Sequence, residues 1–70
     1  MNDCVTLKNI VYLIQSGMSV DEAVPYDLSG ASPGCIIEIC ALYIKYGSDE
    51  HRKKLCREMI DNVTRTDSII

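Results

Sequence analysis

The chain has 70 residues, of which 47% are hydrophobic and 24% are charged, and its acidic residues outnumber Lys and Arg to give a net charge of −3. This length allows one domain and excludes most enzyme folds, while the apolar content excludes long disorder. The acidic balance disfavours a general nucleic-acid binder, which would carry a basic patch or stripe.

The first predicted element is a helix at about residues 4–16. Its apolar residues recur at the spacing of one helical face, namely Leu7, Ile10, Val11 and Ile14. Gly17 follows where a left-handed C-terminal cap belongs. Tyr12 and Val5 project away from this stripe, so we predict an apolar pair on the surface that could anchor a partner.

The second predicted element begins just after Gly17. Ser19 and Glu22 have the spacing of a capping box, in which each side chain bonds the backbone of the other residue. Pro25 disfavours helical geometry at the residue before it and has no N–H donor. We therefore predict a helix that is either a single turn or bent.

A third helix is predicted at about residues 33–46, because a serine cap and a proline precede it and a glycine follows it: Ser32, Pro33 and Gly47. Its charged residues, Glu38 and Lys45, lie on nearly the same helical face. We expect the rest of this helix to be buried, either at the centre of the fold or in a subunit interface.

The fourth predicted helix starts after Ser48, which we expect to be its N-cap, with Asp49 and Glu50 in the first turn. Its apolar stripe consists of Leu55, Cys56, Met59, Ile60 and Val63. The periodicity stops after Thr64, so we predict one helical domain over residues 1–66 and a frayed tail over residues 67–70.

Together these elements predict an all-α fold, a small bundle of three longer helices and one short helix with the central helix at about residues 33–46. A chain this short has a marginal core. We therefore expect either tight wrapping of the central helix by its neighbours or a second copy of the chain, as in a homodimer.

The sequence lacks the pattern of a signal peptide, and its longest nearly apolar run, residues 35–44, falls short of the ~20 residues that span a bilayer. We predict a cytoplasmic protein that does not contact membranes and whose four cysteines are reduced thiols. Cys35 and Cys40 are five residues apart rather than in a Cys-x-x-Cys turn, so we expect no metal and no other cofactor.

Catalysis has little support, because the chain has a single histidine, no Gly-rich phosphate loop and no nucleophile motif. The chain is therefore predicted not to be an enzyme. A basic cluster lies at the start of the fourth helix and consists of His51, Arg52, Lys53, Lys54 and Arg57. Opposite charges occur at i, i+4 spacing around it, including Asp49–Lys53 and Glu50–Lys54. Most of this face is expected to be a compensated, solvated surface.

One cation differs from the others because Arg52 has the spacing of the apolar stripe, where its side chain must snorkel to water or meet an acid. The predicted partner-binding residues are Arg52, Lys53, Arg57, Tyr12 and Val5. We expect a small protein–protein interaction module, a regulator, adaptor or inhibitor, that docks a helix face on a protein partner of unknown identity.

The alternative is a helix-turn-helix DNA-binding regulator that uses the fourth helix. It rests on helices joined by short glycine turns at Gly17 and Gly47 and on the basic cluster. Asp49 and Glu50 argue against it, because they would meet DNA phosphates at the helix start. The sequence therefore disfavours nucleic acid as a partner without excluding it.

Overall fold

The computed structural model describes residues 5–25 and 27–68, without the side chains of residues 5 and 66–68. It contains four helices in these residues and no strand: α1 (Val5–Gln15), α2 (Val20–Ala23), α3 (Pro33–Tyr46) and α4 (Glu50–Ser68). The all-α prediction, with three longer helices and one short one, is confirmed.

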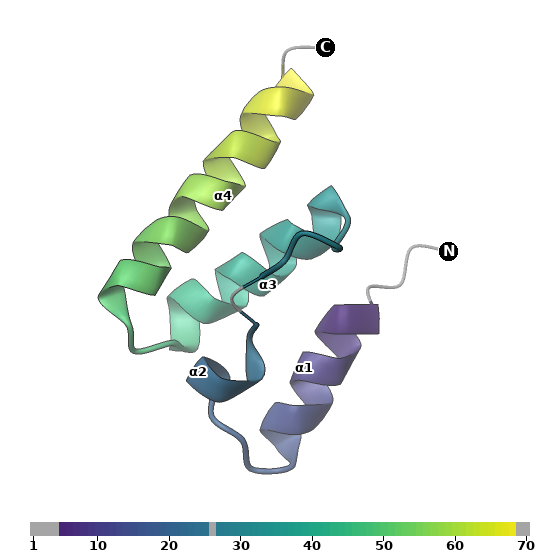
Figure 1. Cartoon of the computed structure of the whole chain (residues 1–70), viewed down its shortest axis with the longest axis vertical. Helices are drawn as coiled ribbons and strands as arrows, with labels where there is room; N and C mark the ends of the chain where they lie inside the picture. The colour runs from purple at the N-terminus through teal and green to yellow at the C-terminus, as the bar shows by residue number, and fades with distance from the viewer. Residues whose placement is uncertain (1–4, 26, 69–70) are drawn as a thin grey trace.

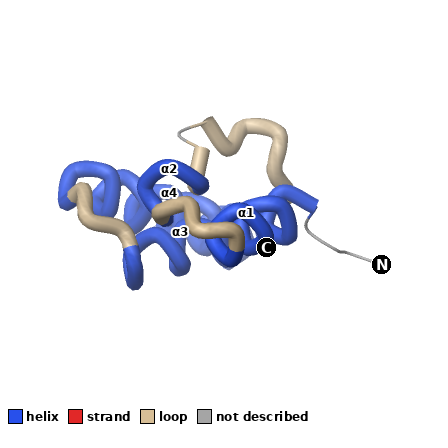
Figure 2. The backbone as a smooth tube through the Cα atoms, turned by 90° about the horizontal axis from the view of Figure 1, so that it is seen from below, coloured by secondary structure: helices blue, strands red, loops and turns tan. Residues whose placement is uncertain are grey.

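The helices lie on either side of α3, with α1 on one flank and α4 on the other (Figure 1). The molecule is flat, with principal dimensions of 41 × 32 × 17 Å. The edge-on view shows the helices in a shallow layer, and the segment that links α2 to α3 rises on one side of it (Figure 2). Val24 and Leu28 of this segment belong to the same buried core as α3.

The turn after α1 has the left-handed cap that the sequence predicts. Gly17 has φ +113°. Its N–H donates to the Ile14 carbonyl at 3.0 Å, and the N–H of Met18 donates to the Leu13 carbonyl at 3.1 Å. These two bonds are the pair that defines a Schellman motif, and they satisfy carbonyls at the helix end.

The one-turn helix α2 begins with the predicted capping box between Ser19 and Glu22. It ends at Val24, which has extended backbone angles and donates its N–H to the Val20 carbonyl at 3.0 Å. Pro25 is the next residue and accounts for the early end, because it disfavours helical geometry at the residue before it.

The central helix α3 also has its predicted start, since the Ser32 hydroxyl accepts a bond from the Cys35 N–H at 3.3 Å and Pro33 is the first helical residue. Gly47 ends the helix with an ordinary φ of −74°. Its small size is required for another reason: a Cβ atom there would lie 2.5 Å from the ring of Tyr43.

The inner face of α3 is the centre of the core, because Ile39, Cys40 and Tyr43 are fully buried. The opposite face is exposed, and it consists of Gly34, Glu38, Ala41 and Lys45. The expected shared face of Glu38 and Lys45 is therefore confirmed. The expectation that the rest of the helix is buried is wrong for Ala41 and for Tyr46, which is exposed near the helix end.

The apolar face of α1 differs slightly from the predicted stripe. Ile10 is buried, and Leu7, Leu13 and Ile14 pack partly buried against the core. Val11, which the periodicity placed in the stripe, is exposed instead. Leu13 takes its place in the packing.

The start of α4 corrects a predicted cap. The carboxylate of Asp49, rather than Ser48, accepts the N–H bonds of the first turn, from His51 at 3.0 Å and from Arg52 at 3.3 Å. The helix then runs to Ser68, beyond Thr64, where the apolar periodicity stops. The first residues of the predicted tail are thus helical, and residues 69–70 lie outside the described part of the chain.

Candidate functional site

The most unusual residue of the core is Arg52, whose side chain is only 4% exposed. One guanidinium nitrogen donates to the Asp21 carbonyl at 2.9 Å, and the other donates to the Val24 carbonyl. The guanidinium carbon lies 4.6 Å from the centre of the Tyr43 ring, within cation–π range. Arg52 thus does not snorkel to water; it satisfies main-chain carbonyls at the end of α2.

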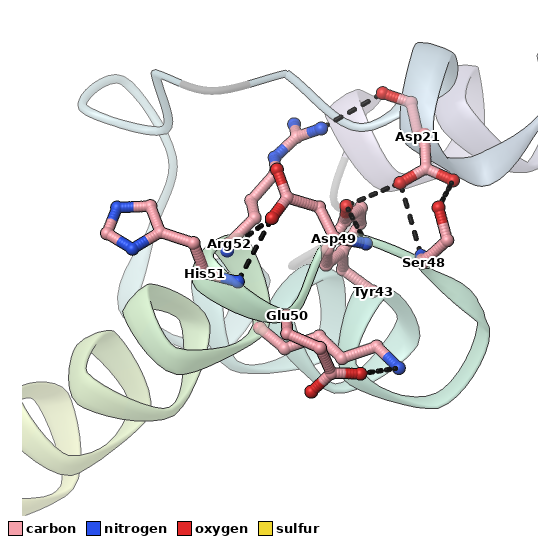
Figure 3. A network of polar contacts seen from close by, with 8 residues as sticks. Asp21, Tyr43, Ser48, Asp49, Glu50, His51 and Arg52 are labelled. Atoms are coloured by element: carbon pink, nitrogen blue, oxygen red, sulfur yellow. Dashed lines mark hydrogen bonds and ion pairs between the residues drawn. The ribbon is translucent and has the colours of Figure 1, made fainter.

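The carboxylate of Asp21 is the second centre of this polar network (Figure 3). It accepts bonds from the Tyr43 hydroxyl at 2.5 Å, the Ser48 N–H at 3.2 Å and the Ser48 hydroxyl at 2.9 Å. The bond from Tyr43, followed by those from Ser48, lowers the pKa of Asp21 to about 2. Hydrogen bonds to the charged form favour that form.

The hydroxyl of Tyr43 also accepts the N–H of Asp49 at 3.3 Å. Burial, and then the bond to Asp21, raises the pKa of this phenol, so Tyr43 is a neutral donor to Asp21. The network therefore joins α2, α3, the turn after α3 and α4. Every buried polar side-chain atom in the described residues has a partner.

Beside Arg52 lies an open cleft of about 220 Å³ between α4 and the segment that follows α2. It is lined by Val24, Pro25, Leu28, Arg52, Leu55, Cys56, Glu58, Met59 and Asn62. Most of these residues are apolar, and Leu55 is 42% exposed although it belongs to the apolar stripe of α4. Arg52 is thus shared between the polar network and the wall of the cleft.

The predicted partner-binding residues do not gather on one surface. Tyr12 is 68% exposed, but it lies on α1, across α3 from the cleft. The side chain of Val5 lies outside the described residues. Arg57 is exposed on α4, and Lys53 is half-buried. The structure thus gives Arg52 an internal role and places Tyr12 on a different helix from Lys53 and Arg57.

The predicted charge pairs at the start of α4 are also rearranged. Lys53 lies 3.4 Å from the carboxylate of Glu50, at i, i+3, rather than pairing with Asp49. The carboxylate of Asp49 is used as the helix cap. Glu50 therefore takes the role that we predicted for Asp49.

The residues that sequence reasoning missed are Val24, Pro25 and Leu28, which form one wall of the cleft. Pro25 enters the sequence prediction only as a helix breaker, and no surface is predicted from these three residues. The signal that could have found them is their apolar character in a segment that otherwise has the composition of a turn. Buried apolar residues in a linking segment indicate that it packs on a helix.

The cysteines differ from one another in their bonding. Cys40 and Cys56 are free thiols, whereas Cys35 is disulfide-bonded, so the prediction that all cysteines are reduced is wrong at Cys35. Disulfides are rare in cytosolic proteins, so this bond is unusual for the predicted location. Burial, followed by the neighbouring Cys56, raises the pKa of the Cys40 thiol to about 12.

Within residues 5–25 and 27–68, no group of three or more His, Cys, Asp and Glu side chains could hold a metal ion. None of the helices described has the length and apolar character needed to cross a membrane. The cleft beside Arg52, by contrast, is an opening with a mostly apolar lining.

No protein family, curated protein or solved structure matches this chain in sequence or structure comparisons.

Proposed function

We propose that the protein is a small interaction module, a regulator, adaptor or inhibitor, whose docking surface for a protein partner is the cleft between α4 and the wall formed by Val24, Pro25 and Leu28. The observation that carries this proposal is the apolar lining of the cleft together with the exposed Leu55. An amphipathic segment of the partner would place an apolar side chain in the cleft, as in helix-in-groove recognition.

The size of the cleft supports a side chain rather than a cofactor as its occupant. Its volume of about 220 Å³ is below the roughly 300–1,000 Å³ that is typical of small-molecule sites. The Arg52 network holds both walls, since it joins α4 to the carbonyls of Asp21 and Val24. A surface that is ordered before binding loses less conformational entropy when a partner docks.

The same geometry supports a protein partner over DNA. Arg52 belongs to the basic cluster in sequence, but its charge is turned inward, and Lys53 is paired with Glu50. The carboxylate of Asp49 caps the start of α4, where a recognition helix would approach phosphates. The cluster thus presents less positive charge than its sequence suggests.

The docking surface can be tested by selecting binders from a displayed library of random peptides. Binding of the selected peptides is then measured to the wild type, to Leu55→Glu and to Tyr12→Ser. Leu55→Glu puts a charge into the cleft at an exposed position, so the fold should persist. Tyr12→Ser is the matched control, because it removes an exposed apolar side chain on α1, away from the cleft.

We expect peptides that share a large apolar residue, with binding at least tenfold weaker to Leu55→Glu and unchanged to Tyr12→Ser. Equal binding to the wild type and Leu55→Glu would refute the cleft as the docking surface. Salt-sensitive binding to mixed DNA, measured in the same assay buffer, would instead favour the DNA-binding alternative.

A further inference from the structure

Three sulfur atoms from two helices meet at the inner side of the cleft. Cys56 and Met59 lie one turn apart on α4 and both line the cleft. Cys40 lies opposite them on α3, with its sulfur 4.0 Å from the sulfur of Met59. Cys40 also lies within hydrogen-bonding reach of the Cys56 thiol. Both cysteines are free and buried.

The ligand set is informative because thiolates and thioethers are soft donors, and soft donors are ligands that Cu(I) favours. Structural zinc sites use four Cys or His ligands and not a thioether. The distance between the Cys40 and Met59 sulfurs also fits a site of this kind. Three ligands placed about 2.3 Å from one ion in a trigonal plane are separated by about 4.0 Å, the distance between the Cys40 and Met59 sulfurs.

The surroundings also suit such an ion. Cu(I) bound by two thiolates and a thioether carries a net negative charge, and the cationic residue Arg52 lines the same cleft, one turn before Cys56. A nearby cation would offset that charge in a buried site. The cleft supplies an entry path to Cys56 and Met59.

We propose that Cys40, Cys56 and Met59 form a binding site for one Cu(I) ion at the inner wall of the cleft. When the ion binds, each cysteine forms a copper–sulfur bond and releases its thiol proton to solvent. Met59 contributes a lone pair of its thioether. The copper keeps its oxidation state throughout, so the step needs no oxidant or reductant.

The proposal is tested by anaerobic titration of the protein with Cu(I) supplied as its bicinchoninate complex. Two variants with the same chemical change are compared, Met59→Leu at the site and Met18→Leu, an exposed methionine in the turn after α1. Leucine is close to methionine in volume, so both variants should fold. Circular dichroism checks that they do.

The wild type and Met18→Leu should each take up one equivalent of Cu(I), with about three sulfur neighbours at about 2.3 Å by X-ray absorption. Met59→Leu should bind at least tenfold more weakly, and Cys40→Ala should lose this binding. The site is refuted if the wild type cannot take copper from bicinchoninate. It is also refuted if Met59→Leu matches Met18→Leu, or if Cys40→Ala keeps the wild-type affinity.

Discussion

At the scale of single residues, Arg52 shows which of its properties helical spacing predicts and which it does not. Its spacing placed it on the apolar side of a helix, and it is indeed buried there. Its acceptors could not be predicted, because they are the main-chain carbonyls of Asp21 and Val24, about 30 residues earlier. Main-chain acceptors cannot be identified from the types and spacing of side chains, because every residue has a main-chain carbonyl.

The low pKa of Asp21 predicts how stability depends on acid. The folded-state pKa is about 2, below the ordinary value of 3.8, so this carboxylate contributes stability above about pH 4. That contribution is lost as the pH falls through the folded-state pKa. In Asp21→Asn the contribution is missing, and the bond from the Ser48 hydroxyl loses its charged acceptor. Urea unfolding between pH 7 and pH 2 measures the difference.

We expect Asp21→Asn to be less stable than the wild type at neutral pH, and the two stability curves to converge as the pH approaches 2. Asp61→Asn, an exposed acid on α4, is the control and should follow the wild type. A constant gap between wild type and Asp21→Asn across the whole range would show that the charge of Asp21 is not the cause.

At the scale of helices and turns, the boundaries that depend on neighbouring residues were predicted correctly. The caps at Gly17, Ser19 and Ser32 use groups within a few residues of each other. The exception is Ser48, whose N–H and hydroxyl both bond to Asp21 on α2. Because Ser48 is bonded to Asp21, the residue that caps α4 is Asp49 instead.

Gly47 gives a prediction at this scale, because its lack of a side chain makes room for Tyr43. In Gly47→Ala the new methyl group would meet the buried ring at 2.5–2.7 Å, so the ring or the turn must shift. Overpacking of this kind costs about 1–3 kcal/mol. Chemical denaturation monitored by circular dichroism should show a loss of this size.

The control is Gly34→Ala in the first turn of α3, where an added Cβ atom meets nothing within 4 Å. Alanine favours helix over glycine by up to about 1 kcal/mol, so this variant should be as stable as the wild type or slightly more stable. If both variants had the same stability, the close approach of Tyr43 to Gly47 would not be a constraint.

At the scale of the whole molecule, the flat arrangement shows that one chain can bury the core face of its central helix. The central helix α3 is covered by α1 on one flank, by α4 on the other and by residues 24–25 and 27–32 across it (Figures 1 and 2). Ile39, Cys40 and Tyr43 are therefore fully buried within a single chain. A homodimer remains a prediction, but these residues do not require it.

The cleft belongs to this scale too, and it could not be predicted from sequence. Its walls come from α4 and from a segment with the composition of a turn, so no local periodicity marks it. The fold class follows from helical spacing and cap residues. The cleft depends on how a linking segment packs against a helix far away in the chain.

The central claim is that buried Arg52 holds α4 against the end of α2 and so forms the cleft. The most direct test is urea unfolding of Arg52→Ala beside Arg57→Ala, an exposed arginine on the same helix. Arg52→Ala removes the partners of two carbonyls and a cation–π contact, so we predict a loss of about 2–4 kcal/mol. Arg57→Ala should change stability by less than about 0.5 kcal/mol. Equal and small effects of the two substitutions would contradict the claim.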